Sequence, residues 1–270
     1  MATEQLTVRE PRVRPAARPS ADDGRAAAVR VSGVSQVFER GRPPVLDGVD
    51  LTVAPGEFVC LVGASGCGKS TLLNLVAGLV QPTAGTVEVS AARPALMFQE
   101  PALLPWLTAS GNVELALKAR GVKRAERRTE AARLLSLVNL ADAGPKRVHE
   151  LSGGMRQRVA LARALAQDSK VLLMDEPFAA LDAITRDVLH VELARIWAEQ
   201  QLSVVFVTHN VREAVRLGTR VVLMGSRPGR IVREWDVELT QPRTIEAPGV
   251  SALATEITSE LHREISRHAA

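Results

Sequence analysis

Two glycine-rich turns, each followed by a helical pattern, hold the residues whose types and spacing could do chemistry. The first turn comprises Gly63, Ala64, Ser65, Gly66, Cys67, Gly68, Lys69, Ser70 and Thr71. It matches the spacing G-x-x-x-x-G-K-[ST] and lies between a strand pattern and a helix pattern, the context in which this motif binds phosphate. Its glycines let backbone N–H groups converge on phosphate oxygens, and the helix start adds a favourable dipole. We therefore expect Lys69 to reach the β- and γ-phosphates of a nucleotide and Ser70 to hold Mg²⁺.

Two adjacent carboxylates, Asp175 and Glu176, follow the apolar run 171–174. An unpaired charge at the end of a buried strand would cost several kcal/mol, and Mg²⁺, through water, is a natural partner for Asp175. Glu176 points differently and can act as general base on the water that attacks the γ-phosphate. The alternative is that one of the two acids caps a neighbouring helix, although the next helix begins only near Asp182.

Gln99 and His209 also follow directly after apolar strand patterns. Because parallel strands deliver their carboxyl ends to one edge of a sheet, both side chains are expected near the first turn. We expect His209 to contact the γ-phosphate and to fix Glu176 or the water, and Gln99 to ligate Mg²⁺ when nucleotide is present. Phe38 could stack on the adenine ring. The alternatives are a hydrogen-bonded core histidine and a plain core phenylalanine.

The second turn, Ser152, Gly153 and Gly154, has the features of another anion site: a serine cap, bare backbone donors and a helix dipole. The sequence has one lysine-bearing phosphate turn, however. If a helical insertion holds Ser152 well away from Lys69, the two turns of one chain cannot both contact the same nucleotide. Two chains facing head to tail would form two shared sites, so the sequence predicts a two-fold dimer.

These residues must be positioned by alternating strands and helices. Strand patterns cover 28–31, 45–53, 58–62, 96–98, 171–174, 204–207, 220–224 and 231–237, and helix patterns cover 70–78, 152–167, 189–196 and 250–267. This alternation predicts an α/β fold with a mostly parallel sheet and helices on both faces. We expect a disordered arginine- and proline-rich tail at 1–28, a main domain at 29–239 with a helical insertion at about 100–165, and a helical extension at 240–270.

Composition limits the class of protein. The chain has 270 residues, 46% of them hydrophobic, a net charge of +4 with mixed signs, and no apolar run near the ~20 residues that cross a bilayer. Cys60 and Cys67 are too few for a disulfide framework and favour reduced thiols. Because Cys67 lies in the first turn, we expect alkylation of its thiol to block nucleotide binding.

The motifs together resemble the ATP-binding subunits of ABC transporters over roughly residues 29–235. The resemblance assigns the Walker A loop to 63–71, the Q-loop to Gln99, the signature to 151–158 and Walker B with its glutamate to 171–176. It also assigns the D-loop to 179–182, with Asp182 contacting nucleotide, the H-loop to His209 and the A-loop to Phe38. Alanine replaces the common serine at 179, and phenylalanine replaces the common tyrosine at 38.

The resemblance implies a P-loop NTPase of the ABC ATPase type, with an antiparallel β part near the N-terminus and an inserted helical subdomain. It implies ATP and Mg²⁺ as cofactors, a homodimer, docking on two membrane permease subunits through a groove at residues 100–106, and an indirect link to a periplasmic or extracellular solute-binding protein. The subunit would be peripheral, at the cytoplasmic face of the cell membrane. The stretches 103–106 (LLPW) and 227–232 (RPGRIV) resemble the nitrate, sulfonate and taurine importers.

Three other functions remain as alternatives at this point. An importer ATPase for another small solute would carry the same motifs. A soluble ABC-type ATPase that acts on nucleic acid usually has two such domains or coiled coils, and the basic stretch 118–128 is better explained as a solvated helix face, so no nucleic-acid partner is expected. A small-molecule kinase would leave the turn at 152–158 unexplained.

Overall fold

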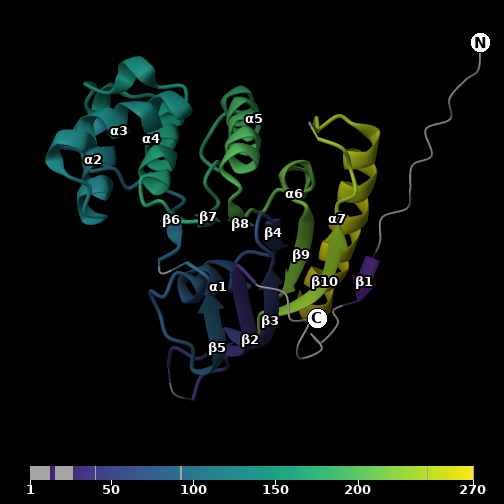
Figure 1. The fold of residues 1–270 in the computed structure, drawn as a ribbon. Helices are drawn as coiled ribbons and strands as arrows, with labels where there is room; N and C mark the ends of the chain where they lie inside the picture. The colour runs from purple at the N-terminus through teal and green to yellow at the C-terminus, as the bar shows by residue number, and fades with distance from the viewer. Residues whose placement is uncertain (1–12, 16–26, 40, 92, 242, 270) are drawn as a thin grey trace, which may run out of the picture.

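The computed structural model describes residues 13–15, 27–39, 41–91, 93–241 and 243–269, and Figure 1 shows how their helices and strands are arranged. Within this part, the larger sheet has seven strands. In spatial order they are β1 (Val13–Pro15), β10 (Arg230–Asp236), β9 (Arg220–Gly225), β4 (Phe58–Gly63), β8 (Ser203–Val207), β7 (Val171–Asp175) and β6 (Ala95–Met97). The strands from β9 to β6 pair in parallel, whereas β10 and β1 add antiparallel at one edge.

A smaller antiparallel sheet lies over the first helix. Its strands, in spatial order, are β3 (Leu46–Val53), β2 (Val29–Gln36) and β5 (Ala84–Val89). This sheet is the predicted antiparallel part. The strand β5 was not predicted from the sequence, because only Val87 and Val89 of its mostly exposed residues alternate with polar ones and pack on the core.

Helices cover both faces of the larger sheet, which an all-buried parallel strand such as β4 requires. They are α1 (Lys69–Val76), α2 (Ala109–Ala119), α3 (Arg124–Leu137), α4 (Gly153–Leu165), α5 (Ala183–Gln200), α6 (Val211–Leu217) and α7 (Pro248–Ala269), with short 3₁₀ turns at Ala141–Ala143 and Val148–Glu150. In Figure 1, α2, α3 and α4 form a group apart from α1, while α7 packs on α6 and β9. The mostly parallel sheet and the inserted helices confirm the predicted fold class.

Alternate residues of β4 serve two different cores. Phe58 and Cys60 join the core shared with α2–α6, whereas Val59 and Leu61 join the core shared with α1 and the smaller sheet. Successive side chains of a strand point to opposite faces, so one apolar run fills both cores. Fixing β4 between two packed layers fixes the turn that follows it.

The disordered tail expected over 1–28 differs from the structure at two places. Ala28 is buried, and its N–H donates to the Val53 carbonyl at 2.8 Å. Residues 13–15 form β1, which pairs with β10 at positions 233–235. This short strand covers the backbone edge of β10 and so protects it from pairing with another chain. The expectation for 1–12 and 16–26 lies outside the described residues. In the described part of the protein, no helix combines the length and apolarity needed to span a membrane.

Candidate functional site

The first glycine-rich turn connects the end of β4 to the start of α1. Gly68 is the N-cap of α1 with φ 99°, a conformation that glycine adopts at little cost. A Cβ on Gly63 would lie 2.5 Å from the carbonyl oxygen of Met224, so backbone packing also requires glycine there. No side chain caps α1. The first backbone N–H groups of α1 therefore have no side-chain acceptor. Such groups at a helix start are the usual donors of an anion site.

Lys69 folds its ammonium back over this turn. The side chain is buried, and Nζ donates to the carbonyl oxygens of Gly63 and Ala64 at 2.9 Å each and lies 3.7 Å from the Sγ atom of Cys67. In the described residues its hydrogen-bond partners are thus neutral groups. No carboxylate among the described residues is hydrogen-bonded to this ammonium, so it is placed to bind an anionic ligand such as a triphosphate at this turn.

The Cys67 thiol points into the protein. The residue is 1% exposed, and burial raises the pKa of its thiol although the Lys69 ammonium lowers it. The thiolate is the nucleophile that attacks an alkylating reagent, so the reaction at Cys67 needs both solvent access and deprotonation, and burial opposes both. The predicted effect of alkylation on nucleotide binding stays a prediction, but the reaction itself should be slow.

Ser70 and Asp175 meet where α1 begins and β7 ends. Burial raises the pKa of Asp175 and the Glu176 carboxylate raises it further, while a hydrogen bond with Ser70 and the charge of Lys69 lower it. A hydroxyl beside a half-buried carboxylate is an all-oxygen donor set of the kind that Mg²⁺ prefers. The residues present therefore fit this ion.

Glu176 and His209 form a direct contact across β7 and β8. The Nδ1 atom of His209 lies 2.9 Å from Oε2 of Glu176, and the Glu176 N–H donates to the carbonyl of Val207 at 3.0 Å. An ionised carboxylate can only accept, so Nδ1–H of His209 is the donor in this contact. The His209 side chain is 65% exposed and that of Glu176 is 22% exposed. The alternative of a core histidine is therefore wrong.

Asp182, rather than Asp175 or Glu176, caps the helix that follows β7. It is the N-cap of α5 and accepts a hydrogen bond from the Thr185 N–H at 2.9 Å. Hydrogen bonds from the Thr185 backbone and side chain lower the pKa of its carboxyl. Asp175 and Glu176, at the end of β7, therefore do not cap this helix.

The second glycine-rich turn begins α4. Ser152 is the N-cap, and its hydroxyl accepts from the Met155 N–H at 3.3 Å. A Cβ on Gly154 would lie 2.5 Å from Cγ2 of Thr185, whereas one on Gly153 would meet its nearest side-chain atom at an ordinary 3.6 Å. Packing on α5 therefore explains the glycine at 154. It does not explain the glycine at 153.

Gln99 follows β6 and is exposed. Its carbonyl accepts from Nε2 of Gln157 in α4 at 3.1 Å. Two residues further, Arg163 of α4 donates to the carbonyls of Pro101 and Ala102 at 2.8 and 2.6 Å. The segment after β6 is thus fastened to the helix that begins at Ser152.

Phe38 lies just beyond β2 and is 61% exposed, so the alternative of a core phenylalanine is wrong. Other predicted residues are joined by contacts in two pairs, Ser70 with Asp175 and Glu176 with His209. Neither Phe38 nor the turn at 152–154 shares such a contact with Lys69 in the described residues. Figure 1 agrees, because α4 stands with α2 and α3 in a group apart from α1.

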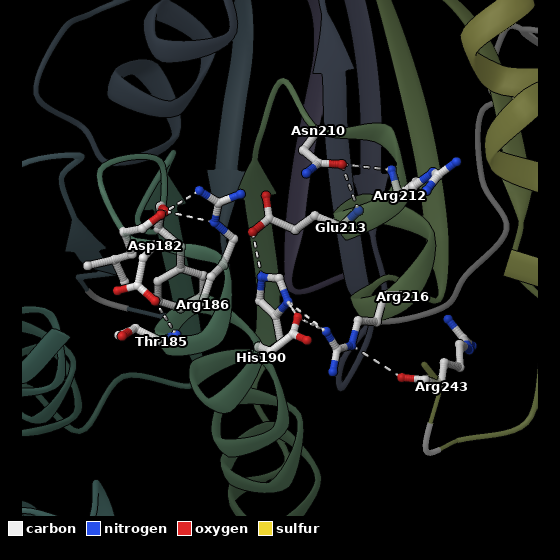
Figure 2. Close-up of polar contacts among 12 residues, drawn as sticks. Asp182, Thr185, Arg186, His190, Asn210, Arg212, Glu213, Arg216 and Arg243 are labelled. Atoms are coloured by element: carbon white, nitrogen blue, oxygen red, sulfur yellow. Dashed lines mark hydrogen bonds and ion pairs between the residues drawn. The ribbon is translucent and has the colours of Figure 1, made fainter. Parts of the chain in front are cut away.

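Sequence reasoning missed a buried polar cluster beside His209 in the chain, formed by Thr208, His190, Glu213 and Arg216. Figure 2 shows the last three of these side chains. Glu213 lies in the first turn of α6, four residues after His209 in the sequence, and this proximity was an available signal. His190 lies on α5 and gave none, since its side chain meets Glu213 only in the folded protein.

Comparison with known proteins gives one consistent result. Residues 46–179 match the protein family described as ABC transporter. The taurine import ATP-binding protein of Mesorhizobium japonicum is 50% identical over 205 residues, which are 73% of this chain and 79% of that protein. The nitrate import ATP-binding protein of Synechocystis is 45% identical, covering 78% of this chain and 83% of that protein.

A solved structure agrees at the level of the fold. The dimeric structure of an ATP-binding cassette in a post-hydrolysis state, bound to ADP and Pi, superimposes with a TM-score of 0.68 at 33% identity. The match covers 78% of this chain and all of that one. With half of the residues identical to a relative over most of its length, the chain belongs to the ABC transporter family and is one of its ATP-binding subunits.

Proposed function

We propose that this protein hydrolyses ATP to drive the import of a small anionic solute, such as taurine, another aliphatic sulfonate or nitrate. The observation that carries the hydrolysis is the contact between Glu176 and His209, 2.9 Å long, at the sheet edge that also holds Ser70 and Asp175. A carboxylate oriented by a histidine is suited to accept a proton from an attacking water.

The phosphate loop and Lys69 would bind the β- and γ-phosphates of ATP. Lys69 exchanges its loop carbonyls for phosphate oxygens, and the first N–H groups of α1 donate to the same ligand. Ser70, Asp175 and Gln99 would hold Mg²⁺, which neutralises charge on the phosphates when bound. Phe38, exposed beyond β2, would stack on the adenine ring.

Glu176 would accept the proton of the water whose oxygen bonds to the γ-phosphorus. The bond between that phosphorus and the bridging oxygen breaks, so ATP and water become ADP and phosphate. His209 holds the Glu176 carboxylate through Nδ1–H, and its Nε2 atom faces away from that contact. Nothing in this step needs a covalent enzyme intermediate.

A second copy would complete each site through Ser152, Gly153, Gly154 and Asp182. Gly153 supports this assignment, because packing inside one chain leaves room for a side chain there. A glycine with space around its Cβ position is explained by close approach of a ligand to the backbone. The related cassette with ADP and Pi is described as dimeric.

Two membrane permease subunits are the proposed partners, which would place the protein at the cytoplasmic face of the cell membrane. Trp106 and Phe98 are 66% and 45% exposed. Large apolar side chains exposed near the segment after Gln99 suit the docking of a permease helix. A solute-binding protein would act indirectly, and no contact with nucleic acid is proposed.

The anionic solute is proposed from the relatives, whose names specify taurine and nitrate import. Cells that lack this chain should lose uptake of labelled taurine or nitrate and regain it when the chain is restored. If the cells lost only the uptake of a solute that carries no sulfonate or other anionic group, the proposed solute class would be wrong and the ATPase assignment would stand.

Replacing Glu176 by Gln tests the hydrolytic assignment. The amide cannot accept the proton, so turnover should fall by ~10²-fold or more while ATP binding and an ATP-dependent dimer, measured by light scattering, persist. The control is Glu199→Gln, which changes a half-exposed carboxylate on α5 and should leave turnover unchanged. Unchanged turnover in Glu176→Gln, or a protein that stays monomeric with ATP, would refute the assignment of Glu176 or of the shared site.

A further inference from the structure

A buried polar cluster, formed by Thr208, Glu213, His190 and Arg216, connects α5 with the segment that carries His209. Figure 2 shows the Glu213, His190 and Arg216 side chains of this cluster. We propose that Glu213 and His190 are positioning residues that hold His209 in place for ATP hydrolysis. This inference rests on the proposed function, because it assigns residues to the same reaction.

Glu213 lies at the centre of this cluster. It is 5% exposed and uses both carboxylate oxygens: Oε1 lies 2.6 Å from Nε2 of His190, and Oε2 accepts a short hydrogen bond from the Thr208 hydroxyl. Its own N–H donates to the Asn210 side chain at 3.2 Å. A buried carboxylate is tolerated where donors satisfy both of its oxygens, and these contacts do so.

The protonation of His190 follows from its second contact. Nδ1 lies 3.2 Å from Nη1 of Arg216, and a guanidinium can only donate. Nδ1 must therefore accept, which leaves the ring neutral with its proton on Nε2, directed at Glu213. His190 is 1% exposed, so no solvent competes for either nitrogen.

The cluster reaches His209 through Thr208. The Thr208 hydroxyl donates to Glu213 and accepts the Asn210 N–H at 3.0 Å, while the Thr208 N–H donates to the Leu61 carbonyl at 3.1 Å. These bonds fix the peptide group that precedes Thr208 and the one that follows His209. The ring itself is 65% exposed and has little packing of its own, so its place over Glu176 depends on this backbone.

Arg216 fastens the cluster to the helix that begins at Asp182. Its Nη1 atom donates to Asp187 of α5 at 2.6 Å, and Nε donates to the Arg243 carbonyl at 3.2 Å. His190 also lies edge-on to Phe178, with ring centroids 5.6 Å apart. If α5 moves relative to β8, the hydrogen bonds of His190, Arg216 and Glu213 must therefore stretch or break, and these bonds hold the segment that carries His209.

A double-mutant cycle tests whether Glu213 acts through His209. Glu213→Gln replaces one acceptor oxygen by an NH₂ group, so one of the two donors loses its partner. We expect kcat for ATP to fall on the order of tenfold with KM changed less than about twofold, because misplacement of a catalytic group affects the reacting state more than binding. In a His209→Ala background, measured under single-turnover conditions, the same substitution should have no further effect.

Conservative substitution at His190 gives a second test. Gln supplies one donor and one acceptor and should retain most of kcat, whereas Phe keeps an aromatic ring, removes both polar atoms and should match Glu213→Gln. The matched control is Glu192→Gln, a buried carboxylate on the same helix that contacts Asn139 and Arg158. Its effect should be equal in the wild-type and His209→Ala backgrounds. Melting temperatures identify any variant that fails to fold.

The outcomes separate this inference from the proposed function. If wild type hydrolyses ATP and Glu213→Gln lowers kcat equally with and without His209, the positioning role is wrong and the ATPase stands. Equal activity of His190→Phe and wild type would also overturn the role. If wild type hydrolyses no ATP, the proposed function fails and this inference fails with it.

Discussion

Adding one methyl group at Gly154 should separate the packing of α4 on α5 from the chemistry of the turn. The Cβ of Gly154→Ala would lie 2.5 Å from Cγ2 of Thr185, well inside van der Waals contact. Thr185 is β-branched and stiff, so either its rotamer or the spacing of the two helices must change. Overpacking of this kind costs about 1–3 kcal/mol, and alanine recovers about 0.5–1 kcal/mol of helix propensity.

The net loss of stability is about 1–2 kcal/mol, which corresponds to a melting temperature lower by about 2–8 °C. Thr185→Ser removes the clashing methyl and keeps the backbone N–H that Asp182 accepts, so the double variant should melt near wild type. The control is Gly144→Ala, whose Cβ would meet its nearest atoms at 3.7 Å in a helical backbone, and whose melting temperature should not fall. If Gly154→Ala melts like wild type, or if Thr185→Ser does not restore it, the contact does not limit stability and the reasoning fails.

Three other predictions follow from the same site. Gly153→Ala should melt like wild type, since its Cβ has ordinary contacts at 3.6 Å, yet lose most ATP turnover if the turn approaches phosphate; full turnover contradicts that role. Burial raises the folded-state pKa of Asp175, so the ionised carboxyl costs stability above that pKa. Asp175→Asn should therefore outlast wild type in thermal melts at neutral pH, and the difference should vanish below the ordinary aspartate range, where both forms are neutral; a lower melting temperature at neutral pH counts against this. Iodoacetamide should label Cys67 far more slowly in the folded protein than in urea, by mass spectrometry, because the thiol is buried with a raised pKa; equal rates contradict the buried geometry.

Local patterns were enough to predict the elements that carry the reacting groups. The apolar run 58–62 followed by the glycine-rich turn predicts β4, the loop and α1, because each signal lies within a few residues of the structure it specifies. The same holds for β7 before Asp175 and for β8 before His209. Their order in the sheet then brings the polar ends of β4, β8 and β7 side by side.

The features that the sequence did not predict depend on contacts between segments far apart in the chain. The pairing of β1 with β10 joins positions more than two hundred residues apart, and a proline-rich stretch gives no strand signal. The direction of the Cys67 thiol depends on Lys69 and on the backbone of Gly63, so its place in the loop did not predict its burial. His190 and Glu213 were missed for the same reason, since a polar residue on a helix is usually solvated.

The helices α4 and α5 have the same organisation, and this suggests why polar residues are retained in their buried faces. Each begins at a capping side chain proposed to face a second copy, Ser152 or Asp182. Deeper along, Gln157 of α4 holds the Gln99 carbonyl, and His190 of α5 holds Glu213 beside the His209 segment. Apolar side chains of equal volume would pack as well but would not hold these loops in one register. Each helix therefore connects its N-terminal end, proposed to face the second copy, with a loop that carries a site residue of its own chain.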